Sequence, residues 1–383
     1  MAGRPTVGVE QLRSYRIVRT GLLRSSAVNR LGIWDLGIQD RDGSSRLALA
    51  VRVADPTTVP DQWPDPGAGD TDQVLVWSLR GAPHLHRRSD VAALAGRLRP
   101  VDEHRAAAEL VGDAARLRST GGDPLAAIDA VVSALRSVVT MPMTKGEASA
   151  AVTAAIPEQF AAACRSCGST HVLEQLFRRS ALPAGIGLVP DTKPVRLAPI
   201  RPAVRETRPT AQRSDLTPLV AAYYENFGAG SPADVATFIG TSTDAVEGVL
   251  PDSLTTATVA GHRTLVTDDL LSSATDGADD AAGSAVRLLP TSDPLLAPRD
   301  RHVWTTEEPV RKELWPVIGS PGAVLAHTAI VGSWRTRLRG RRLTLTVSPF
   351  RRLGRTVLDR LRTEAELVAA LRGAADVEVA VSD

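Results

Sequence analysis

The sequence predicts an α+β fold of about three tandem winged-helix domains, followed by a C-terminal domain rich in antiparallel strands. A plan of helices followed by a strand hairpin occurs three times before residue 275, and repetition is the signature of an array. Three helices followed by a hairpin is the order of a winged helix, a variant of the helix-turn-helix. Stretches rich in Pro, Gly, Asp, Ser or Thr separate the repeats at 55–72, 200–218 and 272–284.

These interruptions predict four domains, over residues 1–120, 121–205, 212–275 and 284–383. Apolar periodicity assigns the elements of the first domain. Helices are expected around 11–23 and 25–36, strands around 47–53 and 74–79, and a further helix over 90–98.

The second domain has the clearest local signals. Asp123 and Pro124 begin a helix, because an N-cap residue followed by proline is a typical helix start. Thr144 and Glu147 have the spacing of a capping box, so a second helix begins near Lys145. A third apolar-periodic segment and a hairpin follow, over 172–179 and 185–200.

The third domain repeats this order, and the C-terminal domain departs from it. Ser231 and Pro232 mark a helix start between a helix over 216–227 and one over 241–250. A hairpin is expected over 255–267. The last domain has a strand over 286–290, alternating strands within 323–350 that turn at Arg339 and Gly340, and a closing helix over 363–371.

Composition sets the class of protein. A hydrophobic content of 43% with 23% charged residues is ordinary for a soluble globular protein. The chain has no apolar run of about 18 residues and no signal-peptide pattern at its start, so we expect a cytoplasmic monomer without membrane contact. Arginine makes up 42 of the 45 basic residues, which suits phosphate binding but also follows from a GC-rich genome.

Two cysteines exclude a disulfide framework. Cys164, Cys167 and His171 have the spacing of part of a zinc site, but structural zinc needs four ligands and the chain has no second Cys-x-x-Cys. Glu174 or a distant histidine would have to complete the set. We therefore expect two reduced cysteines, with no metal and no other cofactor.

The candidate catalytic residues are Gln39, Asp40 and Asp42, which follow an apolar run that ends at Leu36. A glutamine amide can orient a water molecule, because it offers both a donor and an acceptor. A carboxylate can stabilise positive charge that develops on a substrate. The alternative is that these polar side chains only cap the end of a helix.

Two further groups are candidates for DNA contact. His84 and His86 lie two apart in a strand-like segment and should face the same side, to contact phosphate or shape a pocket, unless they pack beneath a loop. Arg80, before Gly81, could bind phosphate at a tight turn.

Arg335, Arg337 and Arg339 recur at every second residue of a strand, so all three share one face. Guanidinium groups about 7 Å apart can follow a phosphate backbone. The alternative is a solvated strand face that discourages edge pairing.

The order of these pieces resembles the AlkZ-like/YcaQ-like winged-helix DNA glycosylases. The matching stretches span almost the whole chain and cover 36–40, 46–52, 79–84, 231–234, 286–290, 298–301 and 331–335. The resemblance implies a monofunctional glycosylase that removes bulky N-alkylated purines. Some members of the family unhook interstrand crosslinks or protect producers of DNA-alkylating antibiotics.

The chain departs from the family in its catalytic signature, which is Gln-x-Gln or Gln-x-Asp. Gln39 matches the first glutamine, although a shift of one residue would make it the second. Position +2 is Arg41, so Asp40 or Asp42 would have to supply what the second residue of the motif supplies.

The function predicted is therefore a DNA glycosylase that removes alkylated purines from double-stranded DNA. The alternative is a non-catalytic winged-helix protein, either a transcriptional regulator or a lesion-binding factor, and the departure from the signature favours it. A winged-helix module for protein interaction is a third class.

Overall fold

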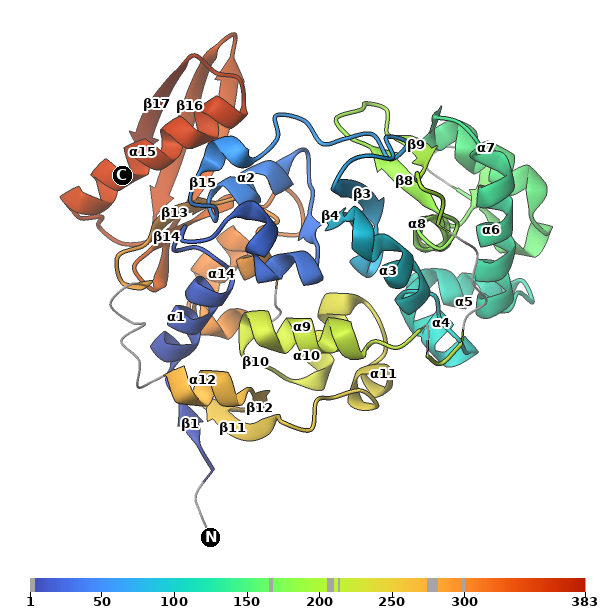
Figure 1. The fold of residues 1–383 in the computed structure, drawn as a ribbon, viewed down its shortest axis with the longest axis horizontal. Coiled ribbons are helices and arrows are strands. Elements are labelled where there is room, and N and C mark those ends of the chain that lie inside the picture. The colour runs from blue at the N-terminus through green and yellow to red at the C-terminus, as the bar shows by residue number, and fades with distance from the viewer. Residues whose placement is uncertain are drawn as a thin grey trace. The chain divides into compact units, whose positions relative to one another are not determined.

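The computed structural model describes residues 4–164, 168–204, 210–212, 214–273, 282–297 and 300–382. The described chain combines helices with several small sheets, which confirms the predicted α+β class (Figure 1). No helix in these ranges is long and apolar enough to cross a membrane.

The chain forms two compact units, each assembled from separate stretches. Unit 1 comprises Met1–Asp61, Ala221–Asp234 and Pro251–Asp383, and unit 2 comprises Gln62–Val220 and Val235–Leu250. The chain passes from one unit to the other inside two helices, α9 (Thr217–Phe227) and α10 (Pro232–Ile239). The division into four sequential domains stays a prediction.

A five-stranded sheet organises the C-terminal part of unit 1. Its order is β13-β14-β15-β16-β17, with bounds Val286–Leu289, Gly322–Ala326, Ala329–Arg339, Arg342–Pro349 and Asp376–Val381. The first four strands run antiparallel, as expected, but β17 pairs parallel to β16. The expected antiparallel domain is therefore a mixed sheet.

Helix α15 (Arg355–Leu371) makes the crossover between β16 and β17. It begins eight residues before the expected start at 363, and the strand after it was not expected. The alternation of Val377, Val379 and Val381 with polar residues is a strand pattern that the sequence does contain.

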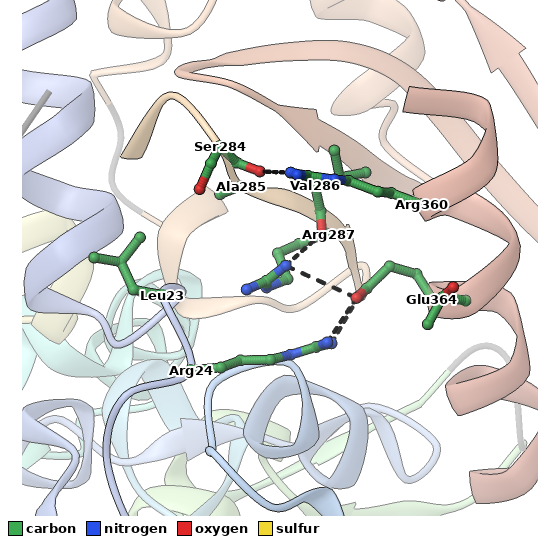
Figure 2. A pocket seen from close by; sticks show the side chains of 9 residues that line it. Leu23, Arg24, Ser284, Ala285, Val286, Arg287, Arg360 and Glu364 are labelled. Carbon is green, nitrogen blue, oxygen red and sulfur yellow. Dashed lines mark hydrogen bonds and ion pairs between the residues drawn. The ribbon is translucent and has the colours of Figure 1, made fainter. Parts of the chain in front are cut away.

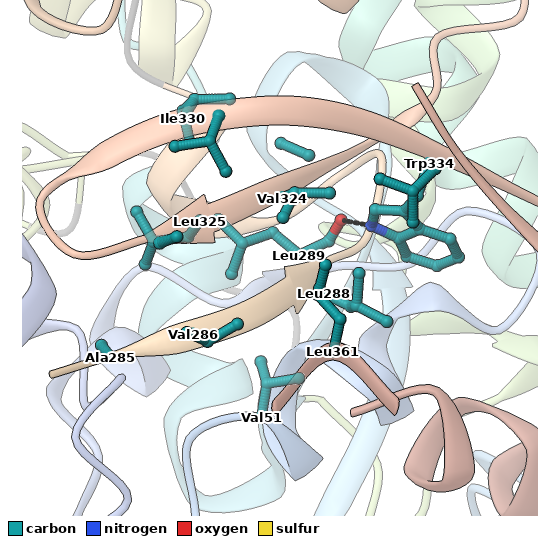
Figure 3. Close-up of a cluster of buried hydrophobic side chains, with 14 of the residues drawn as sticks. Val51, Ala285, Val286, Leu288, Leu289, Val324, Leu325, Ile330, Trp334 and Leu361 are labelled. Carbon is teal, nitrogen blue, oxygen red and sulfur yellow. Dashed lines mark hydrogen bonds between the residues drawn. The ribbon is translucent and has the colours of Figure 1, made fainter. Parts of the chain in front are cut away.

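The core of unit 1 lies between this sheet and two helices (Figure 3). Leu361 of α15 and Val51, directly after α2 (Ser44–Ala50), belong to the same buried cluster as the strand residues Leu288 and Val324. Trp334 donates its indole N–H to the carbonyl of Leu289 at 2.9 Å. The N-terminal segment thus shares a core with the end of the chain.

A smaller sheet in unit 1 joins the N-terminus to the third predicted block. Its order is β1-β11-β12-β10, with bounds Thr6–Val7, Thr255–Val259, His262–Val266 and Ala229–Gly230. The expected hairpin over 255–267 is observed as β11 and β12. The helices that pack against it are α1 (Val9–Arg19) and α12 (Asp268–Ser272), whereas α14 (Glu308–Leu314) contributes Leu314 to the core of the five-stranded sheet.

Two expectations for the first block are wrong. The predicted strand over 47–53 is the helix α2 and its C-terminal end, because Leu47–Ala50 are good helix formers and so short an apolar run has no distinguishing period. The predicted helix over 25–36 is two short 3-10 turns, Val28–Arg30 and Gly32–Asp35, because extended backbone at Leu31 interrupts it.

Unit 2 follows the predicted order of elements closely. Asp123 caps α6 (Pro124–Val138), and Thr144 and Glu147 form the expected capping box of α7 (Lys145–Ala155). Helix α8 (Glu174–Ala181) and the antiparallel hairpin of β8 (Ile186–Val189) and β9 (Arg196–Pro199) follow. The remaining elements are β3 (Gln73–Trp77), β4 (Pro83–Arg87), α3 (Val91–Arg97), α4 (Glu103–Leu110), α5 (Gly112–Ser119), β5 (Met143–Thr144), β6 (Ala161–Ala163), β7 (Thr170–Val172) and α11 (Thr243–Glu247).

Two buried ion pairs tie distant segments of unit 1 together. Arg52 donates two hydrogen bonds to Asp293, at 2.6 and 2.7 Å, and both side chains are fully buried. Arg16 binds Asp300 in the same bidentate way, at 2.5 and 3.0 Å. In a buried ion pair of this kind each charge needs the other, because removal of one partner leaves a buried charge uncompensated.

We expect Asp293→Asn to lower the free energy of unfolding by about 3–5 kcal/mol, because Arg52 would keep a buried charge without a carboxylate. Urea denaturation at neutral pH measures this loss. The matched control is Asp359→Asn, which breaks an exposed pair with Arg362 and should change the free energy by no more than about 1 kcal/mol. Equal effects of the two substitutions would show that the buried pair is dispensable.

Candidate functional site

The predicted catalytic segment forms a tight connection between β2 (Ile38–Gln39) and α2 in unit 1. Gly37, with φ of 74°, turns the chain into β2, where Ile38 is buried and Gln39 is half-buried. Asp42 and Gly43 then adopt left-handed backbone, at φ of 53° and 79°. Aspartate and glycine tolerate this conformation better than other residues, so the sequence suits the turn.

Asp40 is fixed by the start of α2. Its carboxylate accepts hydrogen bonds from the backbone N–H of Ser45 at 2.9 Å and of Gly43 at 3.3 Å, and from the hydroxyl of Ser45. The contacts of Asp40 thus lie at the start of α2, and not at the end of the apolar run before it, where the alternative placed a cap. The same contacts hold a carboxylate in one orientation directly beside Gln39, whereas Asp42 is exposed.

The segment therefore carries an amide at Gln39 and, at the next residue, a carboxylate whose orientation is fixed. The amide of Gln39 offers a donor and an acceptor for water, and the oxygens of Asp40 offer negative charge at a helix N-terminus. The catalytic roles of Gln39, Asp40 and Asp42 are not tested by these contacts and stay predictions.

His84 and His86 lie on β4 in unit 2, with ring centroids 6.1 Å apart and each only 2% exposed. A ring nitrogen of His84 lies 2.9 Å from the carbonyl oxygen of Ala82, and one of His86 lies 2.9 Å from the hydroxyl of Ser78. Burial, and then Arg80, lowers the pKa of His84 well below its usual value, and burial lowers the pKa of His86 to about 4.

Both histidines are consequently neutral at pH 7 and supply no positive charge for phosphate. Their burial fits the alternative of a pair packed inside the fold, or a role in shaping a pocket. A contact with DNA stays a prediction.

Arg80 lies at the turn between β3 and β4, with left-handed backbone at φ of 58°. Its guanidinium donates to the carbonyl of Phe238 and lies 5.2 Å from the centre of that ring. Gly240 permits this arrangement, because a Cβ there would lie 2.9 Å from the Cα of Arg80. These contacts give Arg80 a structural role within unit 2, and its contact with phosphate stays a prediction.

The arginines of β15 have the arrangement predicted from their spacing. Arg335, Arg337 and Arg339 are exposed and alternate with Thr336 and Leu338 along the strand. Arg335 donates to the carbonyl of Gly319 at 2.7 Å. The three side chains form one positive face of unit 1, which we call the β15 arginine face.

The predicted partial zinc site is only partly described. Cys164 is half-buried, Cys167 lies outside the described residues, and His171 has a ring nitrogen 2.7 Å from the carbonyl oxygen of Val172. Glu174 binds Lys145 at 2.7 and 2.8 Å and Arg178 at 2.6 Å, so two cations occupy its carboxylate. Throughout the described ranges, no group of three or more His, Cys, Asp or Glu residues is placed to hold a metal ion. The absence of a metal stays a prediction.

A polar pocket in unit 1 was not anticipated. It has a volume of about 200 Å³, and its lining includes Ser231, Asp234, Asp300, His262 and His302. The two imidazole rings lie 4.3 Å apart, and burial, then the proximity of His262, lowers the pKa of His302. The sequence predicts the hairpin that carries His262 but has no signal that joins it to residue 302.

Comparison with known proteins assigns the class and then the family. Residues 28–375 match the model of a family described as "DNA glycosylase AlkZ-like". The chain belongs to this AlkZ-like DNA glycosylase family, for which DNA is the substrate. No curated protein sequence matches it.

The fold resembles that of a solved structure, Streptomyces sahachiroi DNA glycosylase AlkZ, with a TM-score of 0.71 and 18% sequence identity. The similarity covers 98% of this chain and 100% of the other. At this identity the likeness concerns the fold, which the two proteins share over their full lengths.

The histidine pair makes a testable contribution to stability. Because His86 is neutral in the folded protein with a pKa near 4, and the unfolded side chain titrates near 6.5, its contribution is fully present above pH 6.5. It is lost as the pH falls from 6.5 to 4, by about 3 kcal/mol. The unfolding free energy of His86→Gln should lack this part of the pH dependence, measured by urea denaturation between pH 7 and 4.

The matched control is His104→Gln, which changes an exposed histidine of α4 and should keep the pH profile of the wild type. A His86→Gln profile parallel to that of the wild type would show that His86 is accessible to protons in the folded state.

Proposed function

We propose that the protein hydrolyses the N-glycosidic bond of alkylated purines in double-stranded DNA, as a monofunctional DNA glycosylase. The observation that carries the proposal is the match of residues 28–375 to a DNA glycosylase family, because this range includes the turn with Gln39 and Asp40. The similarity to AlkZ in fold supports the same class.

The reaction requires the protein to stabilise positive charge and to position a water molecule. An N7- or N3-alkylated purine is cationic, so the bond between C1′ and N9 can break with the electron pair leaving on the base. The sugar then carries oxocarbenium character until water adds to C1′ and loses a proton. A fixed carboxylate stabilises the positive charge, and an amide positions the water.

We assign the orientation of water to Gln39 and the stabilisation of charge to Asp40. Asp40 is held by three donors, one from Gly43 and two from Ser45 of α2, so it needs no reorganisation to face developing charge. Asp42 is exposed two residues further on and is the second candidate for the position that Arg41 occupies in the motif.

The organisation proposed for DNA binding is an array of about three winged helices. The order α6, α7, α8 and then the β8–β9 hairpin supports one of them, and α9, α10, α11 with the β11–β12 hairpin supports another. In this arrangement Arg80, His84, His86 and the β15 arginine face are the residues proposed to lie near DNA. That the protein is a cytoplasmic monomer is proposed from the sequence alone and stays a prediction.

The alternative is a non-catalytic DNA-binding protein of the same family. The departure from Gln-x-Gln or Gln-x-Asp favours it, as does the engagement of the Asp40 carboxylate by Gly43 and Ser45. The two functions differ in whether free base is released and in whether one DNA sequence is preferred.

Catalysis and capping by Asp40 can be separated by two substitutions. Asp40→Asn keeps one oxygen that can accept the hydrogen bonds from Ser45 and removes the charge, while Asp40→Ala removes both. We expect Asp40→Asn and Gln39→Ala each to slow single-turnover base release from alkylated duplex at least about tenfold, equivalent to roughly 1.4 kcal/mol.

Asp40→Ala should in addition lower the free energy of unfolding by about 1 kcal/mol, because it removes the acceptor of the hydrogen bonds from Gly43 and Ser45. The matched control is Asp55→Asn, which changes the aspartate that caps the 3-10 helix Pro56–Thr58 of unit 1 and should leave the rate unchanged. Rates of Gln39→Ala and Asp40→Asn that equal the wild-type rate would remove both residues from catalysis.

The β15 arginine face predicts how binding depends on salt. Binding to undamaged duplex should weaken with salt at a log–log slope of about −0.9 per phosphate neutralised. Replacement of Arg335, Arg337 and Arg339 by serine should flatten the slope by up to about three units, equally on unrelated sequences. Fluorescence anisotropy over a series of salt concentrations measures the slope.

The matched control replaces three exposed arginines on or beside α15, Arg355, Arg362 and Arg372, and so removes the same charge. Equal slopes in the two triple variants would mean that net charge acts, and that the β15 arginine face does not touch DNA. A strong preference for one sequence would favour the regulator.

A further inference from the structure

A pocket in unit 1 gathers three arginines from segments that are far apart in the sequence (Figure 2). Its volume is about 290 Å³. Arg24 comes from the turn after α1, Arg287 from β13 and Arg360 from α15. All three line the same pocket, which lies beside the C-terminal end of α2, because Arg24 donates to the carbonyl of Val51 at 3.3 Å.

The charges in this pocket do not balance. Among the described residues that line it, the acidic side chain is Glu364, which faces three guanidinium groups. Arg24 binds its carboxylate at 2.8 Å through both terminal nitrogens, while Arg287 lies 3.8 Å away. Even with Glu364 ionised, an excess of about two positive charges remains in a partly enclosed space.

Arg287 is the most buried cation of this positively charged pocket, and its donors are not all used by the described residues. Its side chain is 13% exposed, and its Nε finds no hydrogen-bond partner among the residues that the structure describes. Burial, and next the proximity of Arg24, lowers the pKa of Arg287 to about 10, so it is still charged at neutral pH. A buried cation with an unused donor is stabilised by an anion that reaches it.

The backbone of Arg24 supports a functional reason for this arrangement. Arg24 has φ of 58°, in the left-handed region that non-glycine residues rarely adopt. Strained residues of this kind persist where the surrounding structure holds them, and they gather at ligand sites. Here the strain directs a guanidinium toward Glu364 and the pocket (Figure 2).

We propose that this pocket binds a phosphate group through Arg24, Arg287 and Arg360. Guanidinium groups present planar pairs of N–H donors that match phosphate oxygens. The volume lies at the lower end of small-molecule sites, which suits a phosphate with part of its substituent. The hydroxyl-bearing residues Ser284 and Thr363 line the same space.

Two sources present this chemistry, a phosphodiester of bound DNA and a free phosphate or mononucleotide. Binding of phosphate does not depend on the proposed base excision. Only the assignment of the phosphate to DNA rests on the proposed function, and the measurements below involve no catalysis.

The first measurement is calorimetric titration of the full chain with inorganic phosphate, at constant ionic strength set with chloride. Arg360→Gln is the principal variant, because Arg360 is exposed and its contact is with the carbonyl of Ser284, so the fold should survive. We expect it to weaken phosphate binding about tenfold. Arg362→Gln, an exposed arginine two residues along α15, is the matched control and should bind as the wild type does.

Glu364→Gln supplies a test with the opposite sign. It removes the one negative charge that competes with the ligand, so phosphate binding should tighten even if the fold becomes less stable. A purely structural role of the cluster predicts no such gain.

The second measurement is duplex binding by the same variants as a function of salt. If the phosphate belongs to DNA, Arg360→Gln should flatten the log–log slope by about one unit while Arg362→Gln does not. If the source is free phosphate, the variants should lose phosphate binding and keep the wild-type slope. The proposal is overturned if Arg360→Gln and Arg362→Gln match the wild type in both measurements.

Discussion

The bidentate contact between Arg52 and Asp293 is the constraint on which the arrangement of unit 1 depends. Arg52 follows α2, the helix that begins directly after Gln39 and Asp40, and Asp293 follows β13 of the five-stranded sheet. Both side chains are excluded from water, so neither charge can be left without the other. Arg52 also donates to the carbonyls of Thr20 at 2.8 Å and Ala48 at 2.7 Å. One guanidinium thus joins the end of α1, the end of α2 and the sheet.

Arg16 and Asp300 form a second buried ion pair of the same kind, seven residues further along the chain from Asp293. Arg16 also donates to the carbonyls of Phe227 and Ala229, so it joins α1, the end of α9 and β10. Both aspartates lie between β13 and α14, where the described residues include two 3-10 helices, Pro294–Leu296 and Arg301–Val303. Through Asp293 and Asp300 this part of the chain is bound to α1 and to the end of α2, the helix that begins directly after the turn with Gln39 and Asp40.

Local signals in the sequence predicted local structure well. The capping box of Thr144 and Glu147 and the start of α6 at Asp123 depend on residues within a few positions, and both are observed. Leu47–Ala50 were assigned wrongly because a short apolar run has the same appearance in a buried strand and a buried helix. The ion pairs could not be predicted, since they join residues 241 and 284 positions apart and no local pattern selects a partner at that distance.

In the candidate site, too, the sequence predicts local features and does not predict contacts between distant segments. The spacing of Arg335, Arg337 and Arg339 was sufficient to place them on one face, because strand period is a local property. The spacing of His84 and His86 also placed them correctly on one strand, but their burial depends on what packs over them. Asp40 was expected beside Gln39, yet its contacts with Ser45 became visible only with the helix in place. The cluster of Arg24, Arg287 and Arg360 comes from three elements and had no signal at all.

The central claim is that this member of the AlkZ-like family releases a base, although its signature has arginine where the family has glutamine or aspartate. Incubation of the purified wild-type protein with duplex DNA containing N7-methylguanine tests it most directly, with chromatographic detection of free base and of the abasic site. The account predicts stoichiometric or catalytic release of 7-methylguanine, with an intact strand until alkali is added. Binding of the lesion duplex without release of any base, under conditions in which the protein is folded, would contradict it.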